Sequence, residues 1–113
     1  MTALLVAVGG AVGALLRWAV GRWLATSGLP WATLLVNVAG SLLLGVVAAA
    51  TDGWLRTLLG TGVAGALTTY SAFALDAVLL ERNGRRGWAV AHVVGNLALA
   101  TAGFALGWWL PPR

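Results

Sequence analysis

Polar and helix-weakening residues interrupt one of the most apolar parts of the sequence, in the segment GALTTYSAF from Gly65 to Phe73. Gly60, Gly62 and Gly65 weaken helical structure just before two consecutive threonines. Unwound backbone leaves carbonyl groups free to bind cations and N–H groups free to attract anions. The segment therefore predicts a helix that is broken in its middle and forms an ion site there.

The same segment carries side chains that could face a narrow passage. Tyr70 and Phe73 are three residues apart and so share one helical face. An aromatic ring is mildly positive at its edge, and the hydroxyls of Thr69 and Ser71 can donate hydrogen bonds. These features would suit an anion, although the aromatic spacing taken alone favours ordinary packing.

Amide, hydroxyl and imidazole groups repeat at helical spacing in two other apolar segments. Thr33, Asn37 and Ser41 lie four residues apart, as do His92 and Asn96. A single polar residue is often a hydrogen bond between helices, and this is the simplest interpretation of His92. A stripe of three polar residues instead predicts a wetted or ion-lined surface. With one histidine and no cysteine, a side-chain metal site has little support.

A glycine-rich segment near the amino terminus, GGAVGALLR, ends on a charged residue. Gly9 and Gly13 form a GxxxG motif, which allows helices to approach closely. The spacing also predicts that Gly10, Gly13 and Arg17 share one face. Arg17 then either points into the helix bundle, where a charge is usually functional, or extends toward the membrane interface.

The elements that position these residues must be membrane helices, because the composition excludes a soluble domain of this size. Of 113 residues, 60% are hydrophobic and 9% are charged. A bilayer core takes about 20 apolar residues per helix. We expect one transmembrane domain over residues 1–113, with helices at about 3–24, 31–50, 54–80 and 88–110. The first is expected to be a retained helix, because it lacks the basic start of a signal peptide.

Turn signals and arginines indicate how the helices are arranged across the membrane. Turns are expected at 26–30, 51–53 and 81–87. The arginines on the side of the first and third loops outnumber those on the other side, which weakly favours a cytoplasmic location for these loops and leaves dual insertion open. The first group is Arg22, Arg82, Arg85 and Arg86, and the second is Arg56 and Arg113.

The motifs GGAVGALLR, VNVAGS and GALTTYSAF, in this order and spacing, resemble the Fluc family of fluoride channels, also called CrcB. The resemblance covers most of the chain. It implies an all-α integral membrane fold with four transmembrane helices per subunit. It also implies an antiparallel dimer of the dual-topology type, a homodimer or a heterodimer with a homologous subunit. Its two narrow pores would conduct fluoride passively out of the cytoplasm across the cell membrane, lowering fluoride toxicity.

The resemblance also implies a role for each residue of the interrupted segment. The family's TTFSTF box is similar to the segment 68–73, which places its two pore phenylalanines on Tyr70 and Phe73. The backbone carbonyls of Gly65 and Thr68 would hold a structural Na⁺ at the centre of the dimer.

Other pore positions of the family fall on the remaining polar residues. The pore asparagine falls on Asn37 and the acidic residue after the box on Asp76, while His92 and Asn96 stand where the family often has Tyr and Ser. Tyr70, Asp76 and His92 depart from the family pattern, and these departures fit one half of a heterodimer. The implied pore lining is Asn37, Thr69, Tyr70, Ser71, Phe73, His92 and Asn96.

Two other classes of membrane protein compete with this interpretation. A small multidrug exporter also has four helices, but it needs a carboxylate buried in the membrane. The first helix has none, and Asp52, Asp76 and Glu81 are expected in or near loops. If the chain were a non-conducting structural subunit, the polar residues at the break in the third helix would serve only for packing between helices. An enzyme is not expected, since no nucleophile–base–acid set is visible.

Overall fold

The structure is a computed structural model that describes residues 1–25 and 28–112. Thr26, Ser27 and Arg113 lie outside the described residues. The expected turn at 26–30 is therefore described only in part, and the Arg113 side chain is not described.

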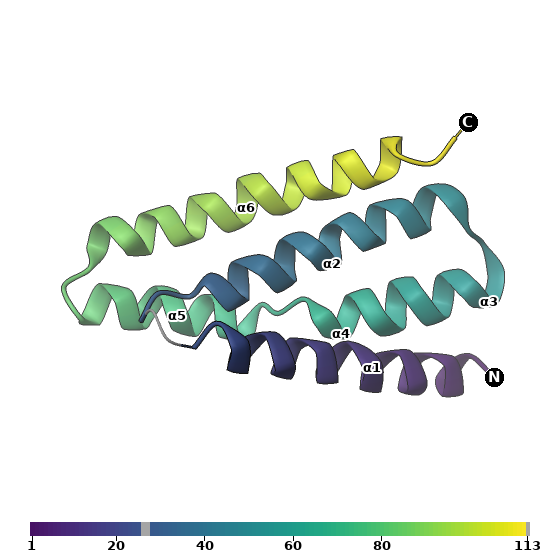
Figure 1. Ribbon diagram of the computed structural model, residues 1–113, viewed down its shortest axis with the longest axis horizontal. Coiled ribbons are helices and arrows are strands. Elements are labelled where there is room, and N and C mark those ends of the chain that lie inside the picture. The colour runs from purple at the N-terminus through teal and green to yellow at the C-terminus, as the bar shows by residue number, and fades with distance from the viewer. Residues whose placement is uncertain (26–27, 113) are drawn as a thin grey trace.

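Four spans of helix dominate the chain, and the described residues contain no β-strand (Figure 1). The first, second and fourth spans are α1 (Thr2–Trp23), α2 (Trp31–Ala50) and α6 (Arg86–Trp109). The third consists of α3 (Gly53–Arg56), the π-helix η1 (Thr57–Ala64), α4 (Gly65–Leu67) and α5 (Ser71–Arg82). All four spans are long and apolar enough to cross a membrane. The predicted all-α fold with four transmembrane helices is confirmed.

The third span changes its local structure where glycines and threonines gather. Gly60 and Gly62 lie within η1, whose wider turn is a form often found at functional positions. The last turn of α4 closes with a bond from the Thr68 N–H to the Ala64 carbonyl, 3.1 Å long. Thr68 itself is extended, with φ −73° and ψ 156°, and helix resumes at Ser71. Residues 68–70 therefore expose backbone groups that an unbroken helix would bond internally.

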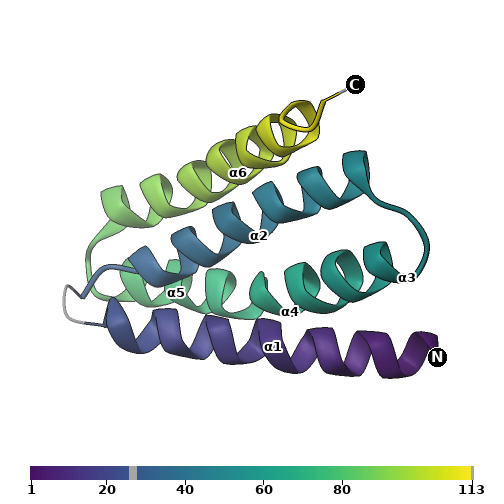
Figure 2. The same cartoon turned by 45° about the vertical axis from the view of Figure 1, so that its right-hand side comes forward.

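The helices form two pairs that lie side by side. Figures 1 and 2 show α1 running along the third span and α2 running along α6. Both termini and the α2–α3 connection lie at one end of the molecule (Figure 1). The α5–α6 connection lies at the other end, where Arg86 forms a 2.6 Å ion pair with Glu81.

Small residues allow α1 to pack directly on the backbone of the third span. A Cβ added at Gly9 would lie 2.3 Å from the Leu58 carbonyl oxygen, and one at Gly13 would lie 2.3 Å from that of Val63. The predicted close approach at Gly9 and Gly13 is confirmed. Gly10 is half-exposed with no atom within 4 Å of an added Cβ, so its expected place on this face is wrong. The contact follows the four-residue row of the helix, from which Gly10 turns away.

Glycines also allow α2 and α6 to pack directly on each other's backbone. An added Cβ at Gly107 would lie 2.2 Å from the Leu42 carbonyl oxygen, and one at Gly45 would lie 2.2 Å from that of Phe104. These obstacles are backbone atoms, which cannot move aside without shifting a helix. The two helices are thus held close enough for short polar side chains to meet between them.

Gly107→Val is therefore expected to lower the free energy of unfolding by about 2 kcal/mol or more, the scale of an overpacked core. Gly95→Val is the matched control, because an added Cβ at Gly95, on the same helix, has no atom within 4 Å. Thermal unfolding in detergent compares the two variants. Equal midpoints would show that α2 and α6 do not pack as closely as described.

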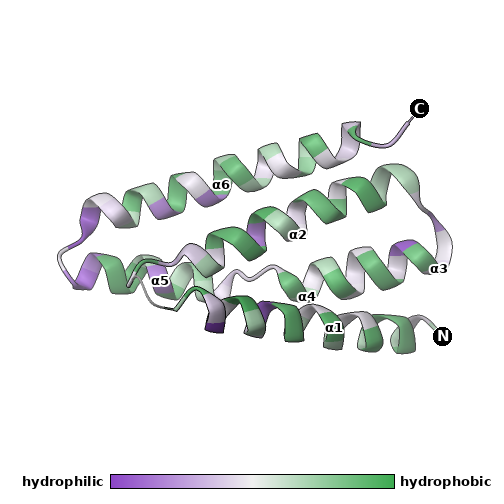
Figure 3. Ribbon diagram, viewed as in Figure 1, coloured by the Kyte–Doolittle hydropathy of each residue, from purple (hydrophilic) through white to green (hydrophobic). Residues whose placement is uncertain are grey.

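Polar residues are sparse along the spans and gather at one end. Figure 3 shows hydrophilic residues mainly at the end with the α5–α6 connection, with isolated ones in the middle of α2 and α6. Outward-facing side chains such as Leu15 and Leu97 are apolar and well exposed. Four spans with apolar outer surfaces make the chain a multi-pass membrane protein.

Candidate functional site

The Asn37 side chain on α2 holds the non-helical residues of the third span. Its Oδ1 accepts a 2.8 Å hydrogen bond from the Thr69 N–H, and its Nδ2 donates to the Thr69 carbonyl at 3.2 Å. The amide thus pairs with one residue's backbone as a neighbouring strand would. Asn37 fixes the unwound segment against α2 and replaces the bonds that a continuous helix would supply.

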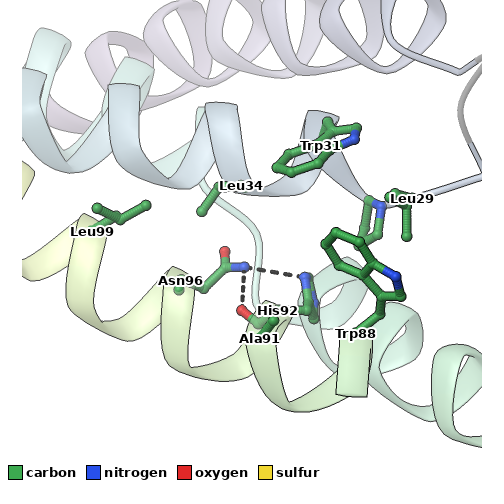
Figure 4. A pocket seen from close by; sticks show the side chains of 10 residues that line it. Leu29, Trp31, Leu34, Trp88, Ala91, His92, Asn96 and Leu99 are labelled. Carbon is green, nitrogen blue, oxygen red and sulfur yellow. Dashed lines mark hydrogen bonds between the residues drawn. The ribbon is translucent and has the colours of Figure 1, made fainter. Parts of the chain in front are cut away.

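A chain of hydrogen bonds continues from Asn37 into α6 and α5. Asn37 Nδ2 also donates to Asn96 Oδ1 at 2.9 Å. Asn96 Nδ2 donates to the His92 carbonyl at 2.8 Å and lies 3.2 Å from His92 Nδ1 (Figure 4). His92 Nε2 lies 3.0 Å from the Phe73 carbonyl oxygen. Both α6 side chains are buried, Asn96 at 4% and His92 at 7% exposure. The unwound segment, α2, α5 and α6 therefore meet in one polar network.

An open groove of about 400 Å³ runs along this network. It brings together most of the predicted site residues, namely Asn37, Gly65, Thr68, Thr69, Tyr70, Phe73 and Asn96. Ser71 does not line it, but its hydroxyl lies 3.4 Å from that of Thr69. His92 lies behind Asn96, in a separate pocket of about 200 Å³ between α2 and α6 with Trp31 and Trp88 near its edge (Figure 4).

The rings of Tyr70, Phe73 and His92 lie next to one another beside the network. Tyr70 and Phe73 have centroids 5.9 Å apart with a 46° tilt, and Phe73 and His92 have centroids 5.1 Å apart with a 32° tilt. Tyr70 is 80% exposed, whereas Phe73 is half-buried. Phe73 is thus fixed by two ring neighbours, while Tyr70 presents most of its surface outward.

The two carbonyls expected to hold Na⁺ have lost their usual helical partners. The Thr69 N–H, which would bond to Gly65 in a continuous helix, donates to Asn37. The Ala72 N–H, which would bond to Thr68, donates to the Thr69 hydroxyl at 3.1 Å. Among the described residues no backbone N–H donates to either carbonyl, and Gly65 accepts only from the Thr68 hydroxyl at 3.3 Å. Carbonyl oxygens are ligands that a hard cation prefers, so these two could supply part of a Na⁺ site.

Asp76 lies within α5 and lines a pocket with Gly28 and Asn83 of the two neighbouring loops, in keeping with its expected position near a loop. It is half-buried in α5, which continues to Arg82, and its Oδ2 accepts a 2.6 Å hydrogen bond from the buried Thr33 hydroxyl. The first residue of the polar stripe on α2 therefore binds a side chain of α5. The stripe revealed Thr33, but sequence spacing gave no sign of its partner.

Arg17 lies one turn beyond the contact between α1 and α4. Gly13, one turn before it, lies against α4, with an added Cβ 3.0 Å from that of Ala66. Arg17 follows on the same row of α1 and is half-exposed. Within residues 1–25 and 28–112 it makes no hydrogen bond or ion pair, so both of its expected orientations stay open.

The fold and the groove together define a multi-pass membrane protein with a polar path between its helices, the arrangement of a channel or transporter. The chain belongs to the CrcB family: the family model described as "CrcB-like protein, Camphor Resistance (CrcB)" matches residues 4–108.

Named relatives are similar over nearly the whole chain. "Fluoride-specific ion channel FluC" of Erythrobacter litoralis is 41% identical, over 90% of this chain and 85% of the relative. FluC 1 of Halobacterium salinarum is 45% identical, over 96% and 92%. FluC 2 of Rhodococcus jostii is 47% identical, over 96% and 94%. The predicted family is confirmed, and the relatives are named as channels rather than enzymes.

Proposed function

We propose that this chain is a subunit of a fluoride-selective channel that conducts fluoride passively out of the cytoplasm. The observation that carries the proposal is the Asn37 amide bonded to the Thr69 backbone at the unwound part of the third span. This contact keeps a row of neutral polar groups along an open groove between apolar helices. The relatives named fluoride-specific channels share this chain's length and much of its sequence.

Neutral hydrogen-bond donors suit the ion. Fluoride is small and strongly hydrated, so a pore has to replace its water with donors, while a full positive charge would hold it too tightly for conduction. The Thr69 hydroxyl accepts from the Ala72 N–H, which leaves its own proton to donate. We assign the first contacts with fluoride to Thr69 and to Ser71, with the edges of Tyr70 and Phe73 beside them.

The position of Asn37 alone indicates a direct hydrogen-bond donor to the ion, but its hydrogen bonds indicate a structural role. Both of its N–H bonds are used, one on Thr69 and one on Asn96. A fluoride ion bound to this amide would have to displace one of these oxygens. In this proposal Asn37 holds the groove in shape. It donates a hydrogen bond to an ion only when that ion displaces one of its protein partners.

The dimer and its Na⁺ form the second part of the proposal. Two carbonyls, of Gly65 and Thr68, are too few for a cation, and an antiparallel second copy would bring two more. The bound Na⁺ would tie the unwound segments of the two copies together. A homologous chain could replace the second copy, and relatives numbered FluC 1 and FluC 2 fit such pairing.

The half-buried carboxylate of Asp76 is the one observation that favours proton-coupled export. Passive conduction and proton-coupled export differ in one measurable way, because only the second needs a proton gradient. The same liposome assay can be run with and without that gradient.

Fluoride efflux from liposomes containing this chain is expected to exceed chloride efflux by at least about tenfold, a barrier difference of about 1.4 kcal/mol. Protein-free liposomes with the same potassium ionophore give the background. Comparable fluxes of the two ions would refute a fluoride channel. Flux that appears only after a homologous subunit is added would establish a heterodimer.

A further inference from the structure

The backbone fixes the direction of every hydrogen bond between Thr69 and His92. A carbonyl oxygen only accepts, so the Asn96 atom 2.8 Å from the His92 carbonyl is its NH₂ group. Asn96 therefore turns Oδ1 toward Asn37, which must donate to it with Nδ2. Asn37 Oδ1 is then left for the Thr69 N–H, which can only donate. Both amides are held in one orientation by backbone groups at the two ends.

The same reasoning fixes the proton on His92. Its Nε2 faces the Phe73 carbonyl oxygen, so Nε2 carries the hydrogen and donates. Its Nδ1 faces the NH₂ group of Asn96 and has to accept. Only the neutral imidazole with its proton on Nε2 meets both conditions.

A second proton on the imidazole would reverse one bond in the middle of this network. Nδ1–H would meet the Asn96 NH₂ group, donor against donor, at 3.2 Å. Rotating the Asn96 amide would not relieve the conflict, because its oxygen would then meet the His92 carbonyl and its NH₂ group would meet that of Asn37. Protonation therefore opposes the contacts that hold Asn37, and through it Thr69.

Few other charged groups lie on the helices packed around His92. The described part of α2 has no titratable side chain, and α6 has only Arg86 besides His92. On α5, Glu81 pairs with Arg86, Arg82 lies in the last turn, and Asp76 bonds to Thr33. Of these groups, Asp76 is the one whose side chain bonds to α2.

We propose that His92 is a positioning residue whose neutral Nε2–H form holds Asn96, Asn37 and the unwound segment in their conducting arrangement, so that acid closes the groove. The inference rests on the proposed channel function. Acid is the condition that adds the second proton, so fluoride flux at two pH values is the quantity to compare.

Fluoride efflux measured at pH 7.5 and pH 5.5, with protein-free liposomes subtracted, tests the inference. Wild type is expected to lose about tenfold in flux at the lower pH, the effect of about one lost hydrogen bond on the barrier. His92→Gln is the conservative variant, since its side chain can donate to Phe73 and accept from Asn96 at either pH. Its flux ratio should stay near one, and His92→Leu should lose flux at both pH values.

The same pH ratio in wild type and His92→Gln would overturn the inference. A second measurement does not depend on transport. The chain has a single histidine, so ¹⁵N labelling of histidine gives one imidazole signal pair, expected to show the Nε2–H tautomer at pH 7.5. The Nδ1–H tautomer would refute the proposed role even if fluoride flux is high. Absent flux at both pH values with the Nε2–H tautomer present would instead count against the channel function.

Discussion

Asn37→Asp is expected to reduce fluoride flux about 100-fold or more. The substitution keeps the size of the side chain and removes both N–H donors. One carboxylate oxygen would then face Asn96 Oδ1 and the Thr69 carbonyl, which lie 2.9 and 3.2 Å from the amide nitrogen. Unpaired buried polar groups cost about 1–3 kcal/mol each, and a barrier increase of about 2.7 kcal/mol is 100-fold in rate.

The matched control is Asn83→Asp, the same chemical change at an exposed residue between α5 and α6. It should conduct as wild type does. Both variants are to be compared by fluoride efflux after size-exclusion chromatography has shown equal recovery of folded protein. Wild-type flux in Asn37→Asp would mean that the amide neither shapes nor lines the path.

The helices could be predicted from the sequence because membrane crossing depends on simple quantities. Length and hydropathy located α1, α2 and α6 to within a residue or two of their observed ends. The π-helical turns of η1 were not predicted, because glycines lower the stability of an α-helix without specifying which backbone conformation replaces it. The non-helical residues after Leu67 are held by Asn37 of α2, a contact that no local pattern contains.

The candidate site could also be predicted only in part. Spacing placed Asn37 on the stripe of α2 and Asn96 one turn after His92, and the structure brings these three side chains together in one network. Spacing could not show that Asn37 bonds to Thr69, since the two are 32 residues apart in sequence. It also gave no sign that the Asp76 carboxylate on α5 accepts a hydrogen bond from Thr33 on α2. Polar pairs between helices need the packing itself to be known.

The direction of each hydrogen bond could not be predicted from the sequence either. A pattern of polar residues names groups that can donate or accept, and only their backbone partners decide which they do. The carbonyls of His92 and Phe73 make this decision here: Asn96 donates to the first, and the His92 ring faces the second. The contact with Phe73 is the hydrogen bond between helices that spacing alone indicated for His92.

Phe73→Ile is the second change expected to have a large effect, with flux falling about tenfold or more. The ring lies between Tyr70 and His92, at 5.9 and 5.1 Å, and its own carbonyl receives the His92 bond. Isoleucine keeps apolar bulk but has no ring edge and no ring to pack on the imidazole. Aromatic pairs contribute about 0.5–1.5 kcal/mol each beyond the area that they bury, so the loss of two, about 2 kcal/mol, corresponds to about tenfold or more in rate.

Changes at Tyr70 separate a pore role from packing. Tyr70 is 80% exposed, so Tyr70→Ile removes a ring edge from the groove without opening a cavity, whereas Tyr70→Phe keeps the edge and loses one hydroxyl. We expect Tyr70→Phe to conduct nearly as wild type and Tyr70→Ile to fall well below it, in liposomes that contain equal amounts of folded protein. If Tyr70→Ile conducts as wild type while Phe73→Ile does not, the aromatic contribution belongs to Phe73 alone. Such a result would make Tyr70 a packing residue in this chain, whereas a pore that had degenerated in one half of a heterodimer would be indifferent to both changes.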